Sequence, residues 1–188
     1  GAGALAMINA QTGVQTVTIP LAGHPEAFAI EQIGGRIFVN VPAAKHVAVV
    51  DRLMREVIAT WTLGAWAGNY AMALDEANQR LFVGCRQPPR LVVLDTKSGK
   101  AVADLEIAGD VDNLFYDAKG RRVYASCGEG FLEVADQTDA DHYAMRPRIP
   151  TAKGARTSLF VEAADTLFLA VPQRESQPAE LRRYHVAP

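Results

Sequence analysis

Four polar side chains that could do chemistry recur at one spacing along the chain. Glu26, Tyr70, Asp112 and Arg156 stand 44, 42 and 44 residues apart, and each comes just before or at the start of a short apolar run. Carboxylates, a phenol and a guanidinium arranged around one axis could hold a cation, bind an anion or stack on an aromatic ligand. Whether the four meet depends on the fold that this spacing implies.

Two kinds of apolar run share the spacing. The first kind reads RIFVNV, RLFVGC, RVYASC and TLFLAV, beginning at residues 36, 80, 122 and 166. The second kind reads HVAVVD, LVVLD and FLEVAD, ending at residues 51, 95 and 136. Runs of strand length repeated every ~43 residues are typical of a β-propeller, in which each repeat is one four-stranded antiparallel blade. The predicted fold class is therefore all-β.

The segment 70–110 contains one complete unit, with strands predicted at 70–74, 80–85, 91–95 and 100–107. In its register the 188 residues form a single array: a partial blade at 1–23, blades at 24–66, 67–110 and 111–152, and a partial blade at 153–188, with 17 strands in all. Residues 52–61 have apolar positions at helical spacing. The repeat frame predicts a hairpin and a fourth strand there instead.

Bulk properties exclude several classes of protein. The formal charge is −2, with 19 Lys and Arg against 21 Asp and Glu, which argues against a dedicated nucleic-acid or anionic-membrane surface. No apolar run reaches the ~18 residues of a membrane span. The start of the chain has neither an initiator methionine nor the basic region of a signal peptide, so we expect it to be cut from something longer. Cys85 and Cys127 occupy equivalent positions and are interpreted as small buried hydrophobes, with a disulfide between blades or a soft-metal site with His46 as the alternatives.

Ligands of propellers bind where the loops that enter the first strands meet the loops from second to third strands. The predicted channel-face residues are Glu26, Tyr70, Asp112, Arg156, Arg86, Arg90, His46 and Trp66. Their arginines predict a basic funnel for a small anionic ligand such as a carboxylate or phosphate, with single-stranded nucleic acid a less favoured ligand. The open alternative is that acids and arginines simply pair across the channel mouth.

A second alternative is a metal site. Glu26, Asn69, Asp112 and Asn113 form an all-oxygen set that could hold Ca²⁺ on the axis, as in sugar-lactonase propellers. Such a site would make the protein a metal-dependent lactone or ester hydrolase. No nucleophile elbow, phosphate-cradling loop or HExxH motif is present, so the favoured prediction is a binding protein without a cofactor.

The units resemble the YVTN-type repeats of bacterial β-propellers. The matching pieces are HPEA at 24–27, RIFVN at 36–40, LVVLD at 91–95 and KSGKAV at 97–102, and the resemblance extends from about residue 5 to residue 186. The resemblance implies a binding or protein-interaction scaffold that is exported to the periplasm or beyond. Members usually carry about seven blades. With little more than four, this chain resembles the carboxyl-terminal part of one, so we expect a piece of a larger ring or self-association that completes one.

Overall fold

A computed structural model describes residues 3–186 as five antiparallel sheets in chain order. The first two residues of the predicted partial blade 1–23 and the last two of 153–188 lie outside the described residues. Sheet A comprises β1 (Ala4–Ile8) and β2 (Gln15–Pro20), and sheet B comprises β3 (Phe28–Ile30), β4 (Arg36–Val41), β5 (His46–Asp51) and β6 (Glu56–Thr62). Sheet C comprises β7 (Ala67–Asp75), β8 (Arg80–Gln87), β9 (Pro89–Asp95) and β10 (Ala101–Glu106). Sheet D comprises β11 (Val111–Asp117), β12 (Arg122–Cys127), β13 (Phe131–Gln137), β14 (Tyr143–Met145) and β15 (Ile149–Pro150), and sheet E comprises β16 (Thr157–Val161), β17 (Thr166–Val171) and β18 (Glu180–His185).

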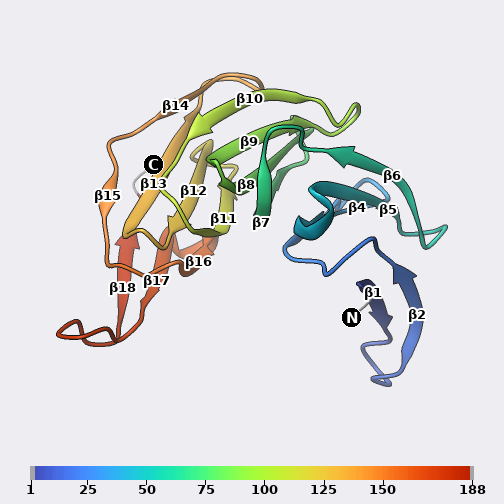
Figure 1. The fold of residues 1–188 in the computed structure, drawn as a ribbon, viewed down its shortest axis with the longest axis horizontal. Helices are drawn as coiled ribbons and strands as arrows, with labels where there is room; N and C mark the ends of the chain where they lie inside the picture. Colours follow the sequence, from blue (N-terminus) through green and yellow to red (C-terminus); the bar gives the residue numbers. More distant parts are fainter. Residues whose placement is uncertain (1–2, 187–188) are drawn as a thin grey trace.

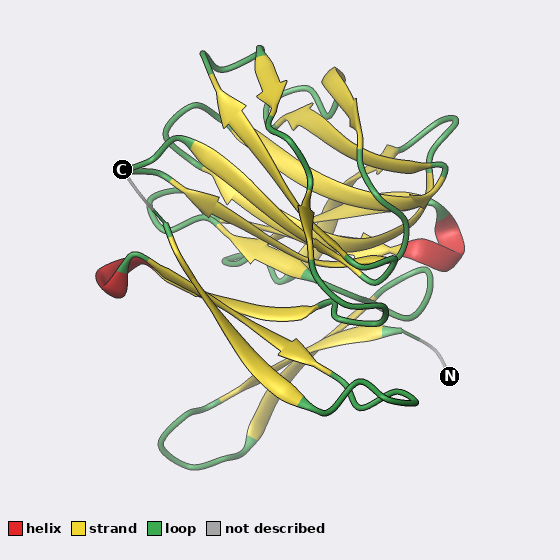
Figure 2. Ribbon diagram, turned by 90° about the vertical axis from the view of Figure 1, so that its left-hand side faces the viewer, coloured by secondary structure: helices red, strands yellow, loops and turns green. Residues whose placement is uncertain are grey.

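The sheets follow one another around an open arc, with sheet A at one end and sheet E at the other (Figure 1). In sheets B and C each strand pairs with the next one along the chain, so a single meander makes the sheet. The first strands β3, β7, β11 and β16 contact one another in turn and line the inside of the arc. Two short helical turns, η1 (Pro42–Ala44) and η2 (Glu162–Ala164), lie at the edges of the stack (Figure 2). The described residues form propeller-type sheets and no closed ring.

Each sheet has two ends with different loops. We call the end where the chain enters the first strand and passes from second to third strand the entry face. The opposite end, with the turns from first to second and from third to fourth strand, is the hairpin face. The aspartate that ends a third strand shapes the turn that follows it: the Asp95 carboxylate accepts hydrogen bonds from the backbone N–H groups of Lys97 and Ser98, at 3.1 and 2.8 Å. Gly99 then takes a φ of +70°, which glycine adopts without steric cost.

Repeated arginines join neighbouring sheets on the hairpin face. Arg36, Arg80 and Arg122 are register partners of the three aspartates that end the third strands, as the repeat predicts. The Arg80 guanidinium forms an ion pair with Asp95 of its own sheet at 2.9 Å. It also donates to the Ala140 carbonyl in the third-to-fourth turn of sheet D, at 3.2 Å. Arg36 donates to the equivalent turn of sheet C, at the Thr96 carbonyl.

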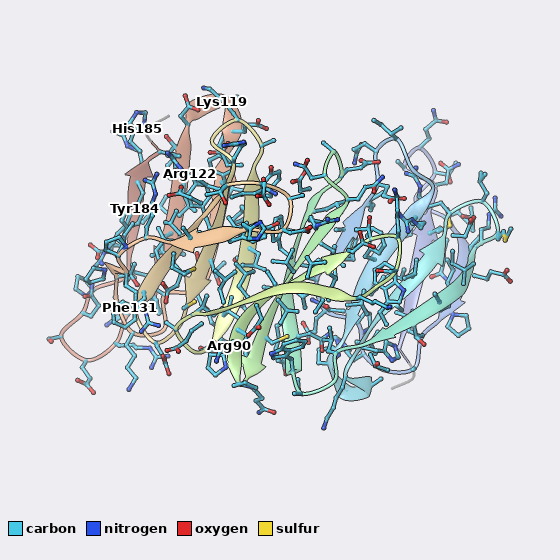
Figure 3. All side chains as sticks on the ribbon, turned by 90° about the horizontal axis from the view of Figure 1, so that it is seen from above. Arg90, Lys119, Arg122, Phe131, Tyr184 and His185 are labelled. Atoms are coloured by element: carbon cyan, nitrogen blue, oxygen red, sulfur yellow. The ribbon has the colours of Figure 1, made fainter. Side chains whose placement is uncertain are left out.

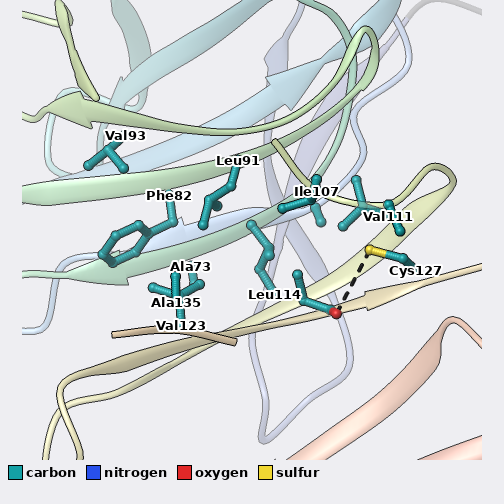
Figure 4. Packing of buried hydrophobic residues seen from close by; sticks show 13 residues of the cluster. Ala73, Phe82, Leu91, Val93, Ile107, Val111, Leu114, Val123, Cys127 and Ala135 are labelled. Carbon is teal, nitrogen blue, oxygen red and sulfur yellow. Dashed lines mark hydrogen bonds between the residues drawn. The ribbon is translucent and has the colours of Figure 1, made fainter. Parts of the chain in front are cut away.

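The core lies between the sheets. Between sheets C and D, Phe82 is fully buried; its ring stacks on Tyr116 at 5.4 Å and meets Tyr143 edge-on at 5.7 Å between ring centroids. Leu91, Val93, Leu114 and Val123 pack in the same cluster (Figure 4). Second and third strands are buried almost throughout, as expected for strands covered on both faces.

Three details of the sequence prediction have clear outcomes. Residues 52–61 form no helix, because 52–55 make a turn and 56–62 are strand β6, as the repeat frame predicted. The described residues contain 18 strands rather than 17, because the fourth strand of sheet D is split into β14 and β15. Pro147 lies in that interruption and has no N–H to donate to the ladder.

Cys85 and Cys127 are both unpaired and buried, and burial raises the pKa of Cys85 to about 12.

Candidate functional site

Four of the residues predicted for the channel face meet at the entry face of sheets C, D and E. Arg86, at the end of β8, lies over the ring of Tyr70 at 4.0 Å from the centroid. Its guanidinium binds Asp112 at 2.7 Å and Asp110 at 3.2 Å. Arg156, just before β16, binds Asp110 at 2.6 Å and approaches Asp112 at 3.9 Å. We call Tyr70, Arg86, Asp110, Asp112 and Arg156 the entry-face cluster.

Asp110 has a backbone conformation that glycine adopts at the equivalent position of two other repeats. Asp110 aligns with Gly68 and Gly154, the residues two positions before Tyr70 and Arg156. All three adopt a positive φ, of 59°, 64° and 84° respectively. Glycine is the usual residue in this left-handed conformation, and an aspartate is tolerated there at some cost. A Cβ on Gly128 would lie 2.1 Å from an oxygen of the Asp110 carboxylate, so glycine there leaves room for that side chain.

The cluster is balanced in charge and only partly buried. Its two arginines face two aspartates, and the side chains of Arg86, Asp110 and Arg156 are 21, 36 and 43% exposed. Hydrogen bonding to the Asp110 carboxylate raises the pKa of Arg156. Partly exposed ion pairs contribute little to stability, typically ~0.2–1 kcal/mol each. Their arrangement instead presents charges of both signs beside the Tyr70 ring.

The other predicted channel-face residues do not join this cluster. Glu26 lies 3.7 Å from His24 in its own entry loop. Arg90 is 3.6 Å from Asp104 on β10, the outermost strand of sheet C. His46 is buried at the start of β5, and burial lowers its pKa. Trp66 packs against the core between sheets B and C.

In the predicted Ca²⁺ set, the side-chain oxygens of Asp112 and Asn113 have protein partners, whereas the buried Oδ1 of Asn69 has no hydrogen-bond partner among the described residues. The Asn69 amide donates to the Asn40 side chain and the His46 carbonyl, at 2.9 and 3.0 Å. Asn113 accepts a hydrogen bond from the Ser158 backbone N–H at 2.8 Å, and the Asp112 carboxylate pairs with Arg86. Among residues 3–186, no three His, Cys, Asp or Glu side chains are grouped so that they could hold a metal ion. To bind a cation, Asp112 and Asn113 would have to give up the partners that they have in this structure.

Sequence reasoning missed two acidic residues. Asp110 stands in a predicted entry loop, and its alignment with two glycines was the available signal. Glu133 on β13 is 1% exposed. It binds the Arg148 guanidinium at 2.9 Å and the Ala108 backbone N–H at 2.7 Å. Nothing in the apolar run FLEVAD indicated such a buried ion pair.

No protein-family model matches the chain, and no curated protein matches its sequence. Solved structures do match its fold. Hydrazine synthase of Kuenenia stuttgartiensis superposes with a TM-score of 0.75 at 16% identity, over 86% of this chain and 46% of the other. A Bacteroides uniformis protein described as a 6-phosphogluconolactonase gives 0.77 at 13% identity, over 98% and 60%. Saccharomyces cerevisiae Sqt1 gives 0.71 at 12% identity, over 90% and 49%.

Likenesses at these identities establish the fold alone: the chain is a β-propeller-type protein. It spans about half the length of the solved structures that it matches. Within the part of the chain that the structure describes, no helix has the length and apolar character needed to cross a membrane.

Proposed function

We propose that this chain is a binding scaffold that uses its entry-face cluster to recognise a protein partner. The observation that carries this proposal is the network of Arg86, Asp110, Asp112 and Arg156, which bridges three sheets and remains partly open to solvent. Interface charges that select a partner must be reachable, and these are.

The charge balance favours a protein surface over a small anion. Both arginines already have carboxylate partners, so an incoming anion would have to compete with Asp110 and Asp112. A partner surface with charges of both signs can instead add its own acidic and basic side chains to the arginines and aspartates of the cluster. Tyr70 with Arg86 over its ring supplies an aromatic and arginine pair of the kind enriched where interfaces bind most tightly.

The test compares two double variants with the wild type. The R86A/R156A variant removes both cationic members of the cluster, and R90A/R182A removes two arginines outside it. Each protein is immobilised, exposed to extract of the source organism, and the captured proteins are quantified by mass spectrometry. We expect a partner that wild type and R90A/R182A retain and R86A/R156A loses by tenfold or more, with the difference reproduced by the purified pair. Equal capture by all three proteins would refute the proposal.

A panel of carboxylates and phosphates tests the small-anion alternative. Calorimetric titration of the wild type is expected to show no saturable binding. An anion that binds the wild type and not R86A/R156A would replace the protein partner in the proposal. The hydrolase alternative is not proposed, since Asp112 and Asn113, two of its four candidate ligands, are engaged by Arg86 and by the Ser158 backbone.

We also infer membership of the YVTN-type repeat family and export from the cytoplasm. Support comes from the repeat motifs and the propeller-type fold. Fractionation of the natural host tests export: an antibody against this chain should detect it in the periplasmic or secreted fraction. Detection in the cytoplasmic fraction alone would contradict it.

A further inference from the structure

A small pocket lies on the entry face between sheets C and D, next to the entry-face cluster. Its volume is about 260 Å³, below the ~300–1,000 Å³ of pockets that hold small-molecule ligands, so it suits a single long side chain. Its apolar wall comprises Pro88, Pro89, Ile107 and Ala108. Gly109, the residue before Asp110 of the cluster, also lines it. In Figure 3 Arg90, which borders the pocket, lies at the lower side of the molecule, and Lys119 of the hairpin face lies at the upper side.

Glu129 is the charged residue of this pocket that has no ionic partner. Its side chain is exposed, and its Oε2 accepts a hydrogen bond from the Gly109 backbone N–H at 2.7 Å. Among residues 3–186, no cation pairs with this carboxylate. A Cβ on Gly109 would lie 2.5 Å from Oε1, so glycine there leaves room for the carboxylate, as Gly128 does for Asp110. The backbone thus holds a negative charge at the pocket without neutralising it.

Neither Glu129 nor Gly109 follows the repeat. The equivalent residues in sheets C and E are Gln87 and Gln173 for Glu129, and Ala67 and Lys153 for Gly109. Those sheets therefore have neither the carboxylate nor the glycine that makes room for it. The combination is specific to sheet D, which also supplies the two aspartates of the entry-face cluster.

The surroundings of the pocket carry more negative than positive charge. Arg90 borders it and is 3.6 Å from Asp104, and Arg148 borders it and binds the buried Glu133 at 2.9 Å. These two arginines face four carboxylates that line the pocket or pair with them: Asp104, Glu106, Glu129 and Glu133. A positive group entering the pocket would therefore be attracted, and an anion would be repelled.

We propose that this pocket accepts a lysine or arginine side chain of the partner protein that the entry-face cluster recognises. The inference rests on the proposed function, since it names a residue type of that partner. Basic side chains pack their apolar stems along apolar surface, here Pro88, Pro89 and Ile107, while the charged head stays in a polar environment. The head would form a charge-assisted hydrogen bond with Glu129.

The probes are N-acetyl-arginine N-methylamide and the corresponding lysine compound, which offer the side chain without a partner protein. The matched control is the citrulline compound, which has nearly the shape of arginine and no charge. Each is titrated into ¹⁵N-labelled protein, and the amide resonances of Gly109 and Glu129 are followed. At least one basic compound should shift both resonances saturably. The citrulline compound should bind at least about tenfold more weakly, because a hydrogen bond between two charged groups is lost.

Two variants make the same change inside and outside the pocket. E129Q removes the charge and introduces the residue that sheets C and E have at this position, so the fold should be kept. E175Q makes the change in the second-to-third loop of sheet E. E129Q should weaken the basic compound by tenfold or more, and E175Q should leave its affinity unchanged. R90A/R182A removes a cation from the rim and should bind no more weakly than the wild type. Melting temperatures check that each variant is folded.

The inference is overturned by no saturable shift of Gly109 and Glu129, by equal binding of the citrulline compound, or by unchanged affinity in E129Q. The captured partner distinguishes this failure from that of the proposed function. If R86A/R156A loses that partner tenfold and E129Q retains it fully, the proposed function stands and the pocket inference falls. If wild type, R86A/R156A and E129Q all capture the same proteins equally, the proposed function falls, whatever the pocket binds.

Discussion

The two faces of the arc use charged residues in opposite ways. On the hairpin face, Arg36 and Arg80 occupy equivalent repeat positions and each reaches a turn of the next sheet. On the entry face, Arg86 and Asp110 have no counterparts of their type in the other repeats, and their network stays partly exposed. Charges that follow the repeat hold neighbouring sheets together. Arg86 and Asp110, which depart from it, lie where a partner can reach them.

The largest loss in the free energy of unfolding is expected for substitutions in the core between the sheets, and the effects on both faces are compared with it. Phe82→Ala removes a fully buried ring that contacts Tyr116 and Tyr143, so we expect a loss of ~3–5 kcal/mol in the free energy of unfolding. Urea denaturation followed by far-UV circular dichroism measures it. Ile33→Ala, at a side chain that is 96% exposed, is the control and should change the free energy by less than ~0.5 kcal/mol. A loss below ~2 kcal/mol for Phe82→Ala would mean that the sheets are not packed through this core.

The next largest loss of stability is expected for substitutions on the hairpin face. Arg80 is 12% exposed and binds Asp95, Asp141 and the Ala140 carbonyl. Arg80→Ala should therefore cost ~2–3 kcal/mol, because partly buried acceptors lose a charged donor. Arg90→Ala, with its single 3.6 Å contact to Asp104, should cost under ~0.5 kcal/mol in the same denaturation experiment. Equal losses for the two variants would remove the distinction between the faces.

A smaller effect with a pH signature is expected at Glu76. Its carboxylate accepts hydrogen bonds from the backbone N–H groups of Gln32, Ile33 and Gly34 in the neighbouring sheet. The bond from Gly34 is the main cause that lowers its pKa below the ordinary value of 4.5. A lowered carboxyl pKa gives stability that is complete above pH 4.5 and is lost as the pH falls through the folded-state value.

Glu76→Gln should accordingly destabilise the protein by ~1 kcal/mol at neutral pH. The difference from the wild type should shrink as the pH is lowered from 4.5 toward 3, which thermal melts across that range would measure. A difference that does not change with pH would show that packing rather than charge joins these two sheets.

Per residue replaced, the smallest stability effect is expected on the entry face. R86A/R156A should lower the free energy of unfolding by less than ~1 kcal/mol for each arginine removed, since the ion pairs that it removes are partly exposed. Chemical denaturation of this double variant beside Arg80→Ala provides the comparison. If R86A/R156A is the more destabilised of the two, the entry-face cluster is structural and its proposed binding role loses its basis.

The sequence predicted the antiparallel sheets of propeller type, because strand runs, turn residues and a period of ~43 residues all agree. It also placed Tyr70, Arg86, Asp112 and Arg156 on one face, since equivalent loops of neighbouring blades must meet there. It could not select among the charges within that face. Arg90 follows the same loop as Arg86, yet it lies on the strand that leads outward and pairs with Asp104.

Other features depend on contacts between sheets that a repeat pattern does not encode. Glu133 is an acid in an apolar run, and only its pairing with Arg148 explains its burial. The break between β14 and β15 coincides with Pro147, which was visible in the sequence, although its position opposite β18 was not. Contacts that do not recur from repeat to repeat can be identified only when the positions of both sheets in space are known.

Asp110 has a consequence for anyone who engineers this repeat. A consensus drawn from its own blades would put glycine there, as at positions 68 and 154, and the backbone conformation would be relieved. The same exchange would delete the carboxylate that both arginines share. Asp110→Gly would therefore give a more stable protein with a weakened recognition surface, and a repeat design that is meant to keep binding should retain this aspartate.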